Sequence, residues 1–363
     1  MNIPALFTPS AMPAADLDAL TVGRTDLLDT LTRRIQSSVK DGSRAHTLLV
    51  GRRGAGKTHT LHVALARALS AAPTAKNVLP VLIAEDSLAI GSYADLLVEM
   101  ARAISPELGE TARALRRARD PVGIEAALIE AAAGRTILLA IENLDRVFDG
   151  IGTAGQGSLR AWVETSTAIL IFATTPALFG GVSSRDYPWY GSFMVEMMTD
   201  LSVDDAATLL NRAAQRRGDT DLVSFLESAT GRERISSIHR LVGGTPRTWH
   251  LLSECVDTAS MQALTPAVDA LLDRLAPYYQ QHLWQLPAGE QRLVVELARG
   301  TGSRTVSDLA DAVGVSNQSA STALGRLAAD HWVISAKTDD DRRTSWYDLT
   351  DPLLRNYLRY RSG

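Results

Sequence analysis

The sequence has little cysteine, no long hydrophobic run and no excess of charge of one sign, and each absence excludes a class of protein. Its single cysteine, Cys255, excludes a disulfide framework and a cysteine-ligated zinc site, so we expect a buried thiol. The longest apolar runs, such as Thr136–Ile141, are far too short to span a bilayer. The first twenty residues also lack a basic start followed by a long apolar stretch. We therefore expect a cytoplasmic protein with no membrane partner.

The charge balance places the same kind of limit on nucleic-acid binding. The chain has 37 basic and 41 acidic residues, a formal net charge of −4, and therefore no overall polyanion-binding character. Any DNA site must be local. With 363 residues, of which 45% are hydrophobic, the chain is long enough for two or three soluble domains with their own cores.

The strongest local pattern is a glycine-rich stretch between a predicted strand at 46–50 and a predicted helix at 58–69. It fits the P-loop pattern and consists of Gly51, Arg52, Arg53, Gly54, Ala55, Gly56, Lys57 and Thr58. Successive backbone N–H groups can wrap a polyphosphate only where no side chain intrudes, which explains the glycines. The alternative is a glycine-rich turn with a solvated lysine, and the pattern arises by chance in about 1% of chains this long.

The P-loop pattern assigns a role to each residue that follows the glycines. Lys57 is expected to reach the β- and γ-phosphates, and the Thr58 hydroxyl is expected to hold Mg²⁺. His59, the next residue, lies in the first turn of the helix whose positive N-terminus faces the anion. The predicted cofactors are therefore ATP or ADP together with Mg²⁺.

Two later strands end in polar groups. The strand at 135–141 is followed by Glu142, Asn143 and Asp145, and the strand at 168–175 ends in Thr174. Parallel α/β sheets present their ligands at the carboxyl ends of the strands. Thr174 could bond the γ-phosphate or the attacking water, or it could cap a turn before Pro176. Further strands are predicted at 78–84 and 193–198, with a helix at 25–39 and a helical stretch at 92–133 broken near two prolines.

The remaining chain divides into an N-terminal arm, a helical segment and a segment of different character. Residues 1–20 read as an extended arm, and from Leu201 the pattern contains only helices. Gly243 and Gly244 precede a helix with Pro246 in its first turn, where Arg247 could reach a phosphate or be an ordinary surface arginine. We expect an arm at 1–21, an α/β core at 22–200, a helical lid at 201–282 and a last domain at 283–363.

The last domain shows the order helix, turn, helix and β-hairpin. Helices are predicted at 291–298, 305–314 and 316–327, and strands at 332–336 and 345–349, which is the winged helix-turn-helix arrangement. The third helix turns small amides and hydroxyls outward, as a major-groove reader requires. The candidate DNA-binding residues are Asn317, Gln318, Ser321, Thr322, Lys337, Arg342 and Arg343. Aspartates at 339–341 balance the wing's positive charge, so a single copy should bind DNA weakly.

Taken in this order, these features resemble the AAA+ ATPases, and within them the archaeal and eukaryotic origin-recognition initiators and the STAND-type signalling ATPases. The resemblance covers nearly everything from Val22 onward. It implies an α/β fold: a P-loop AAA+ core with a parallel sheet and a helical lid, followed by a winged helix-turn-helix domain. The winged domain resembles the multiple-antibiotic-resistance repressor type, whose wing signature corresponds here to Asp341, Arg343, Leu349 and Thr350.

The resemblance also implies roles for individual residues. Glu142 would be the metal-holding acid, Thr174 the sensor 1 residue and Arg247 the sensor 2 arginine. Arg185 would be the arginine finger offered to a neighbouring subunit, with Arg160 as its competitor. The segment that lies against the adenine would be Val22, Gly23 and Arg24.

One departure from the family pattern affects the expected activity. The family usually follows the metal-holding acid with a glutamate that polarises the attacking water, and this chain has Asn143 there. Water activation would fall to Glu142, to Asp145 or to no residue, and general-base assistance is typically worth about 10²- to 10⁴-fold in rate. We therefore expect slow hydrolysis with intact ATP binding.

The expected function is an ATP-dependent switch that couples nucleotide state to homo-oligomerisation and to DNA binding. The alternative is a STAND-like signalling or defence ATPase whose winged helix contacts only protein. A third possibility is a transcription repressor with a decayed ATPase.

Overall fold

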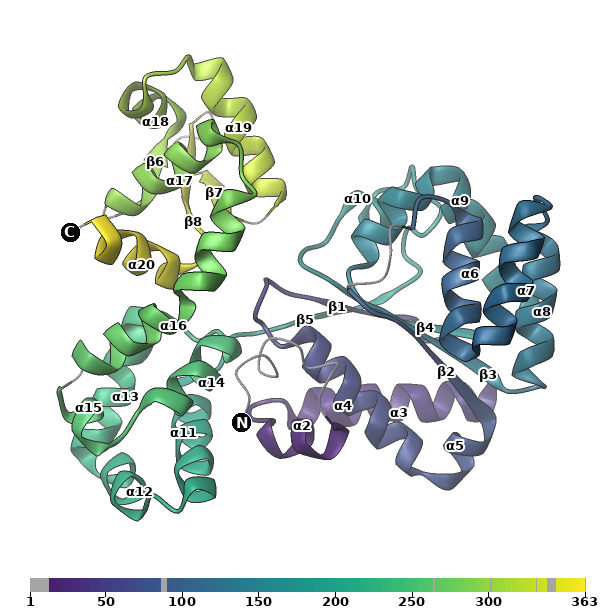
Figure 1. The fold of residues 1–363 in the computed structure, drawn as a ribbon, viewed down its shortest axis with the longest axis horizontal. Coiled ribbons are helices and arrows are strands. Elements are labelled where there is room, and N and C mark those ends of the chain that lie inside the picture. The colour runs from purple at the N-terminus through teal and green to yellow at the C-terminus, as the bar shows by residue number, and fades with distance from the viewer. Residues whose placement is uncertain are drawn as a thin grey trace. The chain divides into compact units, whose positions relative to one another are not determined.

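The computed structural model describes residues 13–85, 90–263, 265–300, 302–330, 332–337 and 344–362. The chain splits into two compact units, Met1–Thr199 and Asp200–Gly363 (Figure 1). The first unit contains a parallel sheet between two layers of helices. The second unit is helical and includes a small antiparallel sheet.

The sheet of the first unit has five parallel strands in the order β2-β3-β4-β1-β5. These are β1 (Thr47–Val50), β2 (Val78–Ile83), β3 (Thr136–Ile141), β4 (Ile169–Thr175) and β5 (Met194–Met197). The register places Val50 beside Thr175 and Ile141 beside Ala173, so the carboxyl ends of β1, β3 and β4 lie side by side. The residues that follow all three strands therefore meet at this end of the sheet.

Helices cover both faces of this sheet (Figure 1). One layer contains α2 (Ala14–Leu20), α3 (Thr25–Asp41), α4 (Lys57–Ser70) and α5 (Ala72–Asn77). The other contains α6 (Tyr93–Ile104), α7 (Pro106–Arg117), α8 (Pro121–Ala132), α9 (Leu144–Ser166) and α10 (Gly180–Ser183). Side chains alternate between the layers: Leu48 and Val50 pack into one core, and Leu49 packs into the other. Such two-sided burial explains why the strands are continuous apolar runs.

A buried histidine joins the strands of this core. His46 accepts a hydrogen bond at Nδ1 from the Ile171 backbone N–H at 3.0 Å, and its ring lies 6.0 Å from the Trp189 ring. Burial lowers the pKa of His46 from 6.5 to about 4. The imidazole is therefore neutral at physiological pH, as an acceptor at Nδ1 requires.

The predicted strands and the breaks near Pro106 and Pro121 are confirmed. The prediction of an extended arm at 1–20 is wrong for its described part, because Ala14–Leu20 is the helix α2. Leu17 is 1% exposed in the core, and Asp18 pairs with Arg67 of α4 at 2.7 Å. The helix is held by contacts with distant residues, and seven residues are too few to show helical periodicity. Residues 1–12 lie outside the described residues.

The second unit begins with helices alone and ends with the small sheet. Its helices are α11 (Val203–Arg217), α12 (Thr220–Glu227), α13 (Ala229–Val242), α14 (Pro246–Cys255), α15 (Thr258–Ala263), α16 (Thr265–Trp284), α17 (Ala288–Arg299), α18 (Val306–Val313), α19 (Asn317–Ala329) and α20 (Pro352–Ser362). Its strands are β6 (Arg304–Thr305), β7 (Val333–Lys337) and β8 (Ser345–Leu349), in the order β6-β8-β7. The predicted helix-turn-helix and hairpin are confirmed, whereas the two-residue strand β6 was not predicted.

The Gly243–Gly244 turn is fixed by backbone contacts. Gly243 has φ +74°, which favours glycine, and Gly244 accepts a hydrogen bond from the Leu201 N–H at 2.8 Å. A methyl group added to Gly244 would clash with the Leu201 carbonyl oxygen and lie 3.1 Å from His239 Nε2. The glycine pair therefore lets the chain pass close to Leu201 before α14 begins.

Candidate nucleotide-binding site and winged helix

The predicted P-loop joins the end of β1 to the start of α4. Gly54 and Gly56 both have φ +85°, a left-handed conformation that L side chains rarely adopt. Lys57 donates from Nζ to the Gly51 carbonyl at 2.6 Å and to the Arg52 carbonyl at 3.2 Å, so its ammonium lies over the loop. The first N–H groups of α4 have no acceptor within the helix. Together these features form a positively polarised concave backbone of the kind that binds anions.

Gly51 is required by a close approach of the chain. A methyl group added there would lie 2.7 Å from Met198 Cβ, which is closer than real contacts allow, and in a tight contact of 3.3 Å with Ala55 Cβ. Met198 follows the edge strand β5 and donates its N–H to the Val50 carbonyl at 2.7 Å. The sequence predicted the glycine at position 51 but not its contact with Met198, because the two residues lie far apart in the chain.

The acid that follows β3 is buried beside α4. The Glu142 residue is 6% exposed, and its N–H donates to the Ile83 carbonyl at 2.9 Å. Its Oε1 lies 3.4 Å from Nε2 of His62, which stands one helical turn after Thr58. Among the described residues, His62 is the one side chain that bonds this carboxylate. Sequence reasoning missed His62, although its spacing from Thr58 places both on one face of α4.

The turn after β3 is bonded to the end of β4. Asn143 has φ +53°, and its N–H donates to Thr174 Oγ1 at 3.1 Å. Thr174 is 1% exposed, so its hydroxyl contributes to holding the two strand ends together. The turn before Pro176 is capped instead by Thr175, whose Oγ1 lies 2.9 Å from the Ala177 carbonyl oxygen.

Thr175 also restrains the second candidate acid. Its Oγ1 lies 3.1 Å from Oδ1 of Asp145, in the first turn of α9. Burial raises the pKa of Asp145, and the hydrogen bond from Thr175 partly opposes this shift. Sequence reasoning did not single out Thr175, because adjacent threonines at a strand end give no signal of which one faces the acid.

The predicted adenine segment lies beside the first turn of α4. Thr21 Oγ1 is 2.8 Å from Nε2 of His59, and burial lowers the pKa of His59 to about 4. Gly23 has φ +65° and connects α2 to α3. Arg24 is 8% exposed and donates to the hydroxyl of Thr199 at 2.9 Å and to its carbonyl. Its guanidinium therefore ties this segment to the chain after β5.

The other candidate arginines contact residues outside the predicted site. Arg53 lies 3.5 Å from Glu85. The guanidinium of Arg185, an exposed residue, lies 5.8 Å from the Tyr190 ring centroid. The competitor Arg160 pairs with Glu164 at 2.6 Å, and Arg247 belongs to the second unit, where it lies over Tyr278. Within the first unit, the structure therefore gathers residues 51–58, Glu142, Thr174 and the segment 22–24.

The winged segment exposes the predicted face of α19. Asn317, Gln318, Ser321 and Thr322 are exposed, whereas Ala320, Ala323, Leu324 and Leu327 are buried, as the sequence predicted. Arg326 on the same helix pairs with the 4% exposed Glu290 at 2.8 Å. The Lys337 side chain, Asp341, Arg342 and Arg343 lie outside the described residues, so the predicted wing contacts are not placed.

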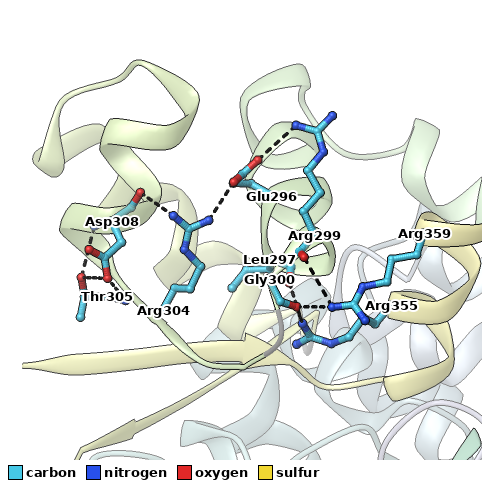
Figure 2. A network of polar contacts seen from close by, with 9 residues as sticks. All are labelled: Glu296, Leu297, Arg299, Gly300, Arg304, Thr305, Asp308, Arg355 and Arg359. Atoms are coloured by element: carbon cyan, nitrogen blue, oxygen red, sulfur yellow. Dashed lines mark hydrogen bonds and ion pairs between the residues drawn. The ribbon is translucent and has the colours of Figure 1, made fainter. Parts of the chain in front are cut away.

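Three arginines of this segment bond to its own backbone (Figure 2). Arg355 donates to the carbonyls of Leu297 and Gly300, and Arg359 donates to the Gly300 carbonyl at 2.6 Å, so both hold the end of α17. Arg304 donates to Glu296 at 2.8 Å and to the Asp308 carbonyl at 3.2 Å. Cations at a helix C-terminus satisfy its orphan carbonyls and complement its dipole. These groups therefore stabilise the winged segment.

Comparisons with known proteins agree with this architecture. A MarR family model matches residues 284–344. A Walker-type ATPase of Pyrococcus abyssi has a similar structure, with a TM-score of 0.61 and 15% identity, over 93% of this chain and 96% of that one. The Aeropyrum pernix ORC1 protein, in complex with DNA, has a TM-score of 0.54 and 14% identity over 98% and 96%. The chain has the AAA+ fold.

A second Aeropyrum pernix protein, ORC2 in ADPNP–ADP complexes, also has a structure similar to that of this chain. The TM-score is 0.51 and the identity is 12%, over 94% of this chain and 95% of that one. No curated protein matches the sequence. Within the described residues, no helix has both the length and the apolar character needed to cross a bilayer. The predicted fold class, an AAA+ core with a winged helix at the C-terminus, is therefore confirmed.

Proposed function

We propose that this AAA+ protein is an ATP-binding switch that hydrolyses ATP slowly and couples nucleotide state to oligomerisation and DNA binding. The loop at 51–58 supports the proposal most strongly, because its left-handed glycines, its lysine and its helix start form an anion-binding backbone. Lys57 would exchange its two backbone carbonyls for phosphate oxygens. Thr21 and His59 would border the adenine side.

The residues present also fit a magnesium ion. Mg²⁺ in nucleotide sites takes one or two protein oxygens together with phosphate oxygens and water. Thr58 and the buried Glu142 supply such oxygens from α4 and from the end of β3. When bound, Mg²⁺ would neutralise charge on the phosphates. The described residues contain no group of three or more His, Cys, Asp or Glu side chains that could hold a metal ion by themselves, so the phosphates and water would supply the other ligands.

Slow hydrolysis follows from the groups around the turn after β3. Asn143 cannot accept a proton, and the carboxylate of Asp145 is bonded to Thr175. Glu142 is engaged by His62 and would also serve the metal. With no acid dedicated to the attacking water, turnover should lack most of the usual 10²- to 10⁴-fold contribution of a general base.

Calorimetry on the full chain tests nucleotide binding. Wild type should bind ATP and ADP in the presence of Mg²⁺, and Lys57→Ala should weaken ATP binding at least tenfold. Lys76→Ala, a change at an exposed lysine of α5, is the matched control and should bind as wild type does. If wild type bound neither nucleotide, or if both variants bound alike, the proposal would be wrong.

DNA binding is proposed from the exposed amide and hydroxyl face of α19. The ORC1 structure that resembles this chain contains DNA, which supports the same role here. Full-length protein with a non-hydrolysable ATP analogue should bind duplex DNA in a salt-dependent manner, and Gln318→Ala should weaken that binding. Light scattering with ATP analogue and with ADP would measure the proposed nucleotide-dependent assembly.

A second candidate function is a signalling ATPase whose winged helix contacts only protein. The observation that favours it is that Arg304, Arg355 and Arg359 bond within the winged segment (Figure 2). In addition, Arg326 pairs with Glu290. Arg326 is the one basic residue of α19, so its pairing leaves that helix with little positive charge for phosphates. Full-length protein that assembled on ATP but bound no DNA at low salt would support this candidate over the first.

A further inference from the structure

One acid of the first unit lies near the candidate nucleotide site but outside the set predicted from sequence. Glu85 follows β2, two residues after Ile83, and its side chain is 45% exposed. The register places Ile83 beside Ile141, and the Glu142 N–H donates to the Ile83 carbonyl at 2.9 Å. Two residues of chain span at most about 7 Å. The backbone of Glu85 therefore lies within that distance of the end of β2, beside the residues that follow β3.

An arginine of the candidate phosphate-binding loop contacts this acid. Arg53 Nη2 lies 3.5 Å from Glu85 Oε1. The loop follows β1, and the sheet order β2-β3-β4-β1-β5 puts two strands between β1 and β2. The ion pair therefore joins the loop to the end of β2 across the carboxyl ends of β3 and β4. The Glu85 carboxylate lies at the same end of the sheet as the loop.

Glu85 differs from the two candidate acids that follow β3. Glu142 is buried, and its carboxylate is bonded by His62. The carboxylate of Asp145 is bonded by Thr175, and burial raises the pKa of Asp145. Glu85 is exposed, so its carboxylate can take a proton from a water molecule and pass it to solvent.

We propose that Glu85 accepts the proton of the attacking water and that Arg53 positions its carboxylate. The inference rests on the proposed function, because it requires ATP in the loop at 51–58. In this step the water oxygen bonds to the γ-phosphorus. The bond from that phosphorus to the bridging oxygen breaks, and its electron pair leaves on ADP. Glu85 takes one water proton and releases it to solvent, and the other proton stays on the phosphate product.

The position of Glu85 also agrees with slow turnover. Asn143 follows the metal-holding acid directly, so the base has to come from the neighbouring strand. An exposed ion pair holds a side chain only weakly. Glu85 therefore occupies the productive position for part of the time and supplies only part of the usual 10²- to 10⁴-fold contribution of a general base.

Steady-state hydrolysis and calorimetry on the full chain test the assignment. Glu85→Gln keeps the size of the side chain and removes its ability to accept a proton. It should lower kcat about tenfold or more and leave the affinity for a non-hydrolysable ATP analogue within about twofold of wild type. The matched control is Glu110→Gln on α7, because Glu110 is also an exposed glutamate paired with an arginine, Arg113. This control should hydrolyse ATP as wild type does.

Two further measurements separate proton transfer from a structural role. Formate should restore part of the activity of Glu85→Ala, because a free carboxylate can enter the space that the side chain leaves. At saturating ATP, Arg53→Ala should lower kcat in the wild-type background and have no further effect in Glu85→Gln, because Arg53 acts through Glu85. Equal effects of Arg53→Ala in both backgrounds would show that Arg53 does not position this acid.

The outcomes distinguish this inference from the function on which it rests. If wild type binds ATP and Glu85→Gln hydrolyses it at the wild-type kcat, the inference is wrong and the proposed ATP binding stands. The same holds if wild type binds ATP without hydrolysing it, or if formate restores no activity to Glu85→Ala. If wild type binds no nucleotide, both are wrong.

Discussion

Replacing His62 tests whether this histidine holds the buried carboxylate of Glu142. The two side chains are 18% and 5% exposed, and their N–O distance is 3.4 Å. A hydrogen bond to a charged group contributes about 1.5–3 kcal/mol net, and the long distance favours the lower value. His62→Phe should therefore lower the free energy of unfolding of the first unit by about 1.5 kcal/mol in buffer with a chelator. For a unit of this size that is a fall in Tm of about 3–6 °C.

Magnesium provides the specific readout. The readout is the increase in Tm when Mg²⁺ replaces the chelator in the presence of ADP. In His62→Phe the cation would be the remaining partner of Glu142, so this increase should be larger than in wild type. His62→Gln keeps an N–H donor near the same place and should behave like wild type. The control is Lys76→Ala, a change at an exposed lysine of α5. Equal Mg²⁺ increments in wild type, His62→Phe and the control would refute the reasoning.

Three further predictions concern stability. Between pH 6.5 and about 4 the unfolded chain binds a proton at His46 that the folded unit excludes. As the pH is lowered through this range, the free energy of unfolding should therefore decrease by up to roughly 3 kcal/mol. Urea titrations of His46→Asn should show a smaller fall. Gly244→Ala should lower Tm, because overpacking costs about 1–3 kcal/mol, whereas Gly289→Ala, where the added methyl meets no described atom within 4 Å, should leave it unchanged or higher. Arg355→Ala should destabilise the second unit by about 2 kcal/mol through its lost carbonyl bonds, and calorimetric scans should show Arg361→Ala within about 1 kcal/mol of wild type.

The sequence predicted those parts of the fold that depend on local pattern. Apolar runs located the five strands, and prolines after Ser105 and Asp120 located breaks in the helical stretch. The helix predicted at 305–314 is α18, and the structure shows that a capping box between Thr305 and Asp308 fixes its start. The helix α2 and the strand β6 were missed, because seven and two residues are too short for a period and depend on distant partners.

The candidate site likewise has a part that the sequence predicted and a part that it did not. The sequence predicts the P-loop, because the left-handed backbone conformation of Gly54 and Gly56 favours glycine. His62 faces Glu142 across eighty positions of sequence, and Arg24 bonds Thr199 at the other end of the unit. Such pairings depend on how strands and helices pack, which residue spacing alone does not give.

The polar contacts of the winged segment bear on the proposed DNA binding. Arg355 and Arg359 donate hydrogen bonds to carbonyls at the end of α17, and Arg326 is paired with Glu290. Amides and hydroxyls on α19 can read bases, but phosphate contacts supply most of the affinity for DNA. A repressor that binds DNA regardless of nucleotide would need strong phosphate contacts from each copy. An assembly that forms on ATP multiplies weak contacts by raising their effective concentration. The low positive charge of α19 is therefore consistent with the proposed nucleotide-driven assembly, and slow hydrolysis would give that assembly a long lifetime.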